Sequence, residues 1–163
     1  MEQPRHRHGA AGPLIVLEPG ERFDSARDHV YLSMWHGRPV ERLVQPGILI
    51  NGDSSSSPAK EIAAELVHRF RLINIGAAGV VRYSLRVDTA LAQWRARAKD
   101  GADLPEGLRV MQPATLLVAV GETYDFEFMP SRPGVYELSA VSVFPPGVRT
   151  SASQPWRQRL VVR

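Results

Sequence analysis

The sequence contains no cysteine. Disulfide bonds are therefore excluded, and so is every metal centre that needs a thiolate ligand. A blue-copper centre belongs to this excluded group, because a cysteine sulfur is one of its ligands. The composition nevertheless suits a folded protein. Hydrophobic residues make up 44% of the 163 positions, which is enough for one domain with a packed core.

Long apolar runs are also missing. No stretch approaches the roughly 18 apolar residues that a membrane-spanning helix needs, so no membrane partner is expected. The polar start from Met1 to Gly12 carries His6 and His8 where a signal peptide would place its apolar core. The sequence as written is therefore expected to carry no export signal.

Lysine is scarce. Lys60 and Lys99 are the only two, and arginine supplies the other cations behind the formal net charge of +3. The arginines are spread along the chain and often alternate with apolar residues, as Arg82 and Arg86 do. This spacing is typical of solvent-facing strand positions and differs from a concentrated basic stripe. We therefore expect no nucleic-acid partner.

Helical periodicity is almost absent, whereas alternation with a period of two recurs. Segments 81–87 and 124–128 alternate apolar with polar residues, which places one face of each strand on a core and the other in water. Turn signals such as Asn51-Gly52 and Asp100-Gly101 separate many short segments, and this pattern predicts an all-β sandwich or barrel. The other expected strands are Leu14–Leu17, Val30–Met34, Ile48–Ile50, Leu66–Ile75, Leu116–Val120, Tyr136–Val143 and Leu160–Val162.

Two segments have helical alternatives. Ser57–Glu65 contains the helix formers Ala, Lys and Glu, although Pro58 fits only the first turn of a helix. Thr89–Ala98 is predicted either as one or two helical turns or as a continuing strand. Between the first expected strand and the rest, Glu18–Asp28 is polar and rich in turn residues, so a domain junction is expected there.

A series of motifs recurs in a specific order. The segment Gly9–Val16 reads Gly-x-x-Gly-Pro-Leu-Ile-Val, and further motifs follow at Arg27–Ser33, Ile48–Gly52, His68–Ile75, Lys99–Leu104 and Val120–Phe126. In order and spacing these motifs resemble the multicopper oxidase family, including its laccase-like members. The first is similar to the end of that family's first cupredoxin domain, and the others are similar to strands and turns of its second domain. Together they cover most of the chain.

The resemblance implies a cupredoxin-like Greek-key β-sandwich. Residues 1–27 then correspond to the residual C-terminal edge of a first cupredoxin domain, and residues 28–163 to a second, copper-free domain. In the family, copper is held in the first and third domains by His-x-His pairs and a His-Cys-His motif. The intact protein oxidises phenols, amines or metal ions with dioxygen. Because those ligand-bearing parts are missing, we expect no catalytic, cofactor-binding or metal-binding residue in this chain, which alone is expected to be inactive.

The resemblance leaves several explanations of the short chain open: a misassigned start, a gene remnant or a functional short paralogue. The implied partners are neighbouring cupredoxin domains, or further copies of the chain that associate through exposed interdomain faces. The implied location is periplasmic or secreted, by analogy with the family. A hypothesis of another class is a stand-alone β-sandwich binding module, or a small copper-sequestering protein that uses His6 and His8.

The histidines are the residues that most invite a metal site. His6 and His8 alternate and so point to one side of an extended strand, where two imidazoles can share a metal; the alternative is a disordered polar tail. His36, in Trp35-His36-Gly37, echoes a copper motif of the family but follows the predicted junction, so a surface histidine is expected. His29 and His68 stand singly and are expected to be surface or half-buried strand residues.

The acidic pairs and tryptophans have simpler interpretations. Asp100 with Asp103 falls on a hairpin tip, and Asp125 with Glu127 falls on the outward face of a strand, so both pairs are expected to be solvated. Tryptophans occur at positions 35, 94 and 156, and packing in the core or between domains is expected for them.

Overall fold

The structure is a computed structural model that describes residues 11–35, 47–54, 56–76, 79–143 and 155–163. Strands dominate it, and the helical structure within these ranges is a single 3₁₀ turn at Glu106–Leu108. No helix among the described residues is long and apolar enough to cross a membrane. The expected all-β class is confirmed.

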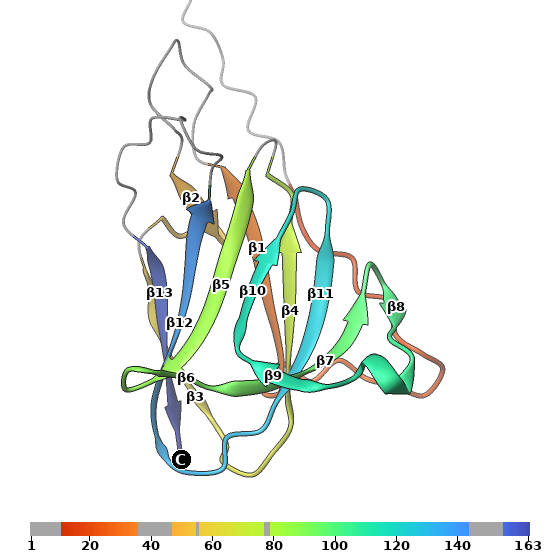
Figure 1. Cartoon of the computed structure of the whole chain (residues 1–163). Coiled ribbons are helices and arrows are strands. Elements are labelled where there is room, and N and C mark those ends of the chain that lie inside the picture. The colour runs from red at the N-terminus through yellow and green to blue at the C-terminus, as the bar shows by residue number, and fades with distance from the viewer. Residues whose placement is uncertain (1–10, 36–46, 55, 77–78, 144–154) are drawn as a thin grey trace, which may run out of the picture.

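The strands of the described residues form two sheets that pack face to face (Figure 1). The larger, sheet A, has the order β2-β1-β4-β11-β7-β8, with β9 beside β7. Its strands are β1 (Asp28–Trp35), β2 (Ile48–Ile50), β4 (His68–Asn74), β7 (Gln93–Lys99), β8 (Ala102–Asp103), β9 (Met111–Pro113) and β11 (Thr123–Phe128).

Sheet B is built mainly from the middle and the end of the chain, in the order β10-β5-β12-β13-β3, with β6 beside β5. Its strands are β3 (Ser56–Ile62), β5 (Val80–Val87), β6 (Ala90–Leu91), β10 (Thr115–Val118), β12 (Gly134–Val143) and β13 (Trp156–Val162). The pairings of β1 with β4 and of β13 with β3 are parallel, and the other pairings between named strands are antiparallel.

Both predicted turns have the positive backbone angles that their sequences indicate. Asp100-Gly101 closes the β7–β8 hairpin, and Asn51-Gly52 turns the chain between Ile50 and Asp53, which form an isolated antiparallel bridge. Asn51 and Gly52 have φ of 52° and 93°, and Asp100 and Gly101 have φ of 50° and 80°. Asparagine, aspartate and glycine tolerate this left-handed region best, which is why such pairs join antiparallel strands. Asn51 also fixes its turn by side-chain bonds, because its Oδ1 accepts from Leu32 N–H at 2.8 Å and its Nδ2 donates to Val30 O at 2.7 Å.

The core lies between the sheets and follows the predicted alternation. Tyr83 and Leu85 of β5 are fully buried, whereas Arg82 and Arg86 are exposed. Trp94 and Trp156 are also fully buried, which confirms core packing for these two tryptophans, while the side chain of Trp35 lies outside the described residues. Trp94 stacks on a phenylalanine of β11 with ring centroids 4.4 Å apart.

Both helical alternatives are wrong. Residues 56–62 form β3, which joins the edge of sheet B beside β13, and residues 90–91 and 93–99 form β6 and β7. The helix-forming composition of the first segment does not decide its structure. One edge of β13 is free to pair with this segment through backbone hydrogen bonds. Pro58 is compatible with this position because β3 is an edge strand.

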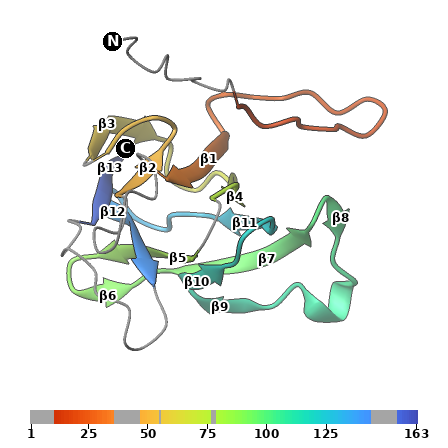
Figure 2. The same ribbon diagram turned by 90° about the horizontal axis from the view of Figure 1, so that it is seen from above.

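The first predicted strand is also wrong. Residues 11–27, named the N-terminal arm here, carry no strand, although Leu14–Leu17 has an apolar sequence. Figure 2 shows the arm running along the outer side of sheet A, on the side away from sheet B. The arm turns at Pro19-Gly20, within the segment expected to be rich in turns, since Gly20 has φ of 91° and Glu21 N–H donates to Glu18 O at 2.9 Å.

Candidate functional site

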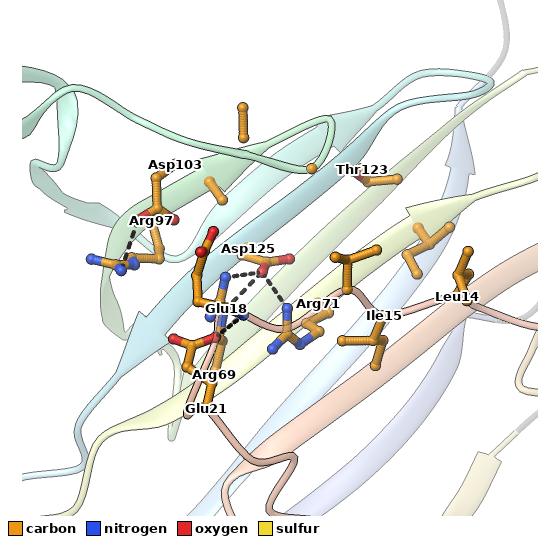
Figure 3. A pocket seen from close by; sticks show the side chains of 15 residues that line it. Leu14, Ile15, Glu18, Glu21, Arg69, Arg71, Arg97, Asp103, Thr123 and Asp125 are labelled. Carbon is orange, nitrogen blue, oxygen red and sulfur yellow. Dashed lines mark hydrogen bonds and ion pairs between the residues drawn. The ribbon is translucent and has the colours of Figure 1, made fainter.

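A cavity of about 460 Å³ lies between the arm and the outer face of sheet A. Ile15, Glu18 and Glu21 line it from the arm, and Arg69, Arg71 and Asp125 line it from β4 and β11 (Figure 3). Ile15 and Leu17 are half-buried, whereas Leu14 and Val16, which lie at the rim of the same cavity, are 90% and 84% exposed. The arm therefore lies over charged side chains of sheet A and leaves the apolar side chains of Leu14 and Val16 largely exposed to solvent.

The charged floor of the cavity is a network of ion pairs centred on Asp125. Its Oδ2 accepts from Arg69 Nη2 at 2.7 Å, from Arg69 Nε at 2.8 Å and from Arg71 Nη1 at 2.8 Å. Arg71 Nη2 also donates to Asp28 Oδ1 at 3.0 Å. The strand register brings these groups together, because Asp125 of β11 lies opposite Arg71 of β4. Burial raises the pKa of Asp125, and the two arginines partly offset this effect.

The expectation that Asp125 and Glu127 are solvated is wrong. Both side chains point to the outer face of sheet A, as the alternation predicts, but neighbouring groups shield them from water there. The Asp125 side chain is 14% exposed and that of Glu127 is 18% exposed; Glu127 pairs with Arg95 and, at 3.8 Å, with Arg97. The other acidic pair does lie at the β7–β8 hairpin, where Asp100 Oδ1 accepts from Thr123 N–H and Asp103 pairs with Arg97 at 2.8 Å.

A second polar cluster lies inside the sandwich. His29 of β1 and His68 of β4 are only 2% and 1% exposed, so the expectation of surface or half-buried histidines is wrong. Their rings stack with centroids 5.2 Å apart, and His29 Nε2 lies 3.1 Å from His68 Nδ1. Both histidines point into the core, on the same strand faces as Tyr31 and Phe70, whose rings are also stacked.

The hydrogen bonds of this cluster determine which ring nitrogens carry a proton. His68 Nε2 faces Ala63 O at 2.9 Å, and a carbonyl only accepts, so the proton of a neutral His68 is on Nε2. His68 Nδ1 is then the acceptor for His29 Nε2–H, which leaves His29 Nδ1 to accept from Lys60 Nζ at 2.7 Å. Lys60 Nζ also donates to Ser25 O of the arm at 3.2 Å.

This arrangement keeps His29 uncharged. Burial lowers the pKa of His29 from 6.5 to about 3, with further lowering from Lys60 and His68 and opposition from Asp28. Burial also lowers the pKa of Lys60. The cluster is therefore a chain of hydrogen bonds from Ala63 O through the two rings to Lys60 at the edge of sheet B.

Solved structures that resemble this chain are multicopper oxidases and laccases. A variant of the multicopper oxidase McoA from the hyperthermophile Aquifex aeolicus matches with a TM-score of 0.63 and 17% identity, over 85% of this chain and 32% of that chain. The laccase from Botrytis aclada matches with 0.61 and 14%, over 82% and 29%. The blue copper oxidase from Nitrosomonas europaea matches with 0.58 and 16%, over 83% and 43%. No family model and no curated protein matches the sequence.

The chain has the cupredoxin-like β-sandwich fold of these oxidases, as the sequence motifs predicted. It spans less than half the length of each of the three. At 14% to 17% sequence identity, these comparisons show the fold and nothing further.

The fold family implies copper, and the described residues do not fit a copper centre. The sequence offers no cysteine, and no group of three or more His, Cys, Asp or Glu side chains in the described ranges could hold a metal ion. All four ring nitrogens of His29 and His68 are engaged by Lys60, by each other and by Ala63 O. The sequence candidates His6 and His8, and also His36, lie outside the described residues.

Proposed function

We propose that this chain is a copper-free cupredoxin domain of a multicopper-oxidase architecture, with a structural role toward neighbouring domains. The observation that carries the proposal is the match itself, which covers more than four-fifths of this chain but only 29% to 43% of the three oxidases. In this proposal residues 28–163 are the second domain and residues 1–27 are the residual edge of the first. Oxidation of phenols, amines or metal ions with dioxygen then belongs to an intact parent.

The proposal predicts that the chain alone is not an oxidase. After loading with copper, the purified chain is expected to show no intense blue absorption from a copper–thiolate centre. It is also expected not to oxidise a phenolic dye above a control that contains the same copper without protein. Dioxygen consumption followed with an electrode checks the second point independently of colour.

Two results of the copper experiment would contradict the structural role. Turnover of the dye above the copper control would make the chain an oxidase by itself. Tight, stoichiometric copper binding that is lost in His6→Ala and His8→Ala would instead favour the copper-sequestering alternative. A matched substitution of a polar residue in the same segment, Gln3→Ala, controls for changes that remove no imidazole.

The exposed face of the arm supports an interdomain surface. Leu14 and Val16 are almost fully exposed on a segment that pairs with no strand of the described residues, and single chains rarely leave such neighbours uncovered. Sedimentation velocity is therefore expected to show a mass that rises with concentration above the 18.1 kDa of one chain. Replacing both with lysine is expected to reduce the association, whereas Leu117→Lys on β10 is expected to leave it unchanged. A monodisperse monomer at all concentrations would contradict this surface.

A further inference from the structure

The amino group of Lys60 has an unusual set of partners. Lys60 is half-buried on β3, and its Nζ donates to His29 Nδ1 at 2.7 Å and to Ser25 O at 3.2 Å. Both acceptors are uncharged. Within the described part of the chain, no carboxylate lies within 4.0 Å of this nitrogen. The environment therefore offers an ammonium ion little charge compensation.

The second lysine of the chain provides an internal contrast. Lys99 Nζ pairs with Glu122 Oε1 at 3.0 Å and lies 5.1 Å from the centroid of the Tyr124 ring. Hydrogen bonding to Tyr124 and to Glu122 raises the pKa of Lys99, whereas burial lowers the pKa of Lys60. One chain therefore holds one lysine whose charge is stabilised and one whose charge is not.

The partners of Lys60 match the bonding capacity of a neutral amine. A neutral amine has two N–H groups and one lone pair, whereas an ammonium has three N–H groups and no lone pair. With one N–H on His29 Nδ1 and the other on Ser25 O, the lone pair stays free. His29 cannot offer a negative charge in return, because its other nitrogen is committed to His68.

We propose that Lys60 is a nucleophilic lysine and the chain's preferred lysine for Schiff-base formation with small aldehydes. In this reaction the neutral amine attacks the carbonyl carbon, and a C–N double bond replaces the C–O double bond. The carbonyl oxygen leaves as water with the two amine hydrogens, so no oxidant or reductant is needed. The resulting imine nitrogen carries no N–H and gives up the bonds to His29 and Ser25.

Competitive labelling tests this inference. The full chain is treated with a trace of formaldehyde and cyanoborohydride near neutral pH, and each site is followed by peptide mass spectrometry. Because reactivity follows the neutral fraction, we expect Lys60 to be methylated at least about tenfold faster than Lys99. The α-amino group of Met1 is measured on its own peptide and does not enter the ratio. Equal rates, or faster labelling of Lys99, would overturn the proposal.

Two variants of His29 separate reactivity from mere exposure. His29→Gln keeps an uncharged acceptor beside Lys60 and is expected to retain fast labelling. His29→Asp places a carboxylate there, which stabilises the ammonium, and is expected to slow labelling of Lys60 by about tenfold or more. Unchanged labelling in folded His29→Asp would overturn the proposal. Should that variant not fold, the pH–rate profile of the unaltered chain decides, because the midpoint for Lys60 must lie below that for Lys99.

Discussion

Replacing Asp125 with asparagine is expected to lower the free energy of unfolding by about 3 kcal/mol. The carboxylate is the common acceptor of two arginines, and Arg71 is only 8% exposed. Asparagine keeps the shape but removes the charge, so Arg71 is left buried with Asp28 as its one anionic partner. Arg71 Nε is already buried without a hydrogen-bond partner, which makes a further loss harder to compensate.

Urea unfolding followed by tryptophan fluorescence measures this change. Glu137→Gln is the matched control, because Glu137 pairs with Arg157 at 3.3 Å but both side chains are substantially exposed. Exposed pairs contribute little, so the control is expected to change stability by less than about 1 kcal/mol. Equal, small effects in the two variants would show that the arm does not shield the Asp125 network from water.

Acid is expected to destabilise the chain through His29. The pKa of His29 is 6.5 when unfolded and about 3 in the fold, where burial disfavours the charged ring. Between these two pH values the unfolded chain binds one proton more than the folded chain, so stability rises with pH in this window. Stability is therefore lost as pH falls from 6.5 toward 3, at about 1 kcal/mol per pH unit from this group.

The variant His29→Gln isolates that contribution. Glutamine can donate to His68 and accept from Lys60, but it does not titrate. Urea titration at several pH values measures the unfolding free energy of the unaltered chain and of the variant. The value of the unaltered chain minus that of the variant is expected to fall steadily as the pH is lowered. The other ionisable groups are common to both proteins and cancel in the difference. A difference that is independent of pH would contradict a neutral, buried His29.

The sequence predicted the elements that depend on local chemistry. Ile48–Ile50 is a strand at the predicted residues, and the chain turns at Asn51-Gly52 and at Asp100-Gly101, because few other residues adopt positive φ without strain. The alternation in β5 also gave its buried and exposed faces correctly. These features require no knowledge of what lies beside each strand.

The errors about the polar side chains concern which segments lie beside a strand. Asp125 faces outward as its alternation indicates, but whether an outward face meets water depends on the arm, which no local pattern reveals. The burial of the two histidines could have been predicted from the strand alternation. His29 lies two residues from Tyr31, and His68 two residues from Phe70, so each shares the inward face with an apolar aromatic residue. Their pairing depends on the parallel register of β1 and β4, a long-range property of the sheet. Lys60 joins them only because β3 is a strand.

The position of β3 has a consequence for biosynthesis. Its partner in sheet B is β13, and the hydrogen bond from Gln158 to Pro58 joins residues 100 positions apart. A chain that emerges from the ribosome amino end first must therefore hold β3 without this partner until β13 has been made. The composition of β3 limits aggregation during this period, because its serines, proline, lysine and glutamate make a polar edge that pairs poorly with other chains.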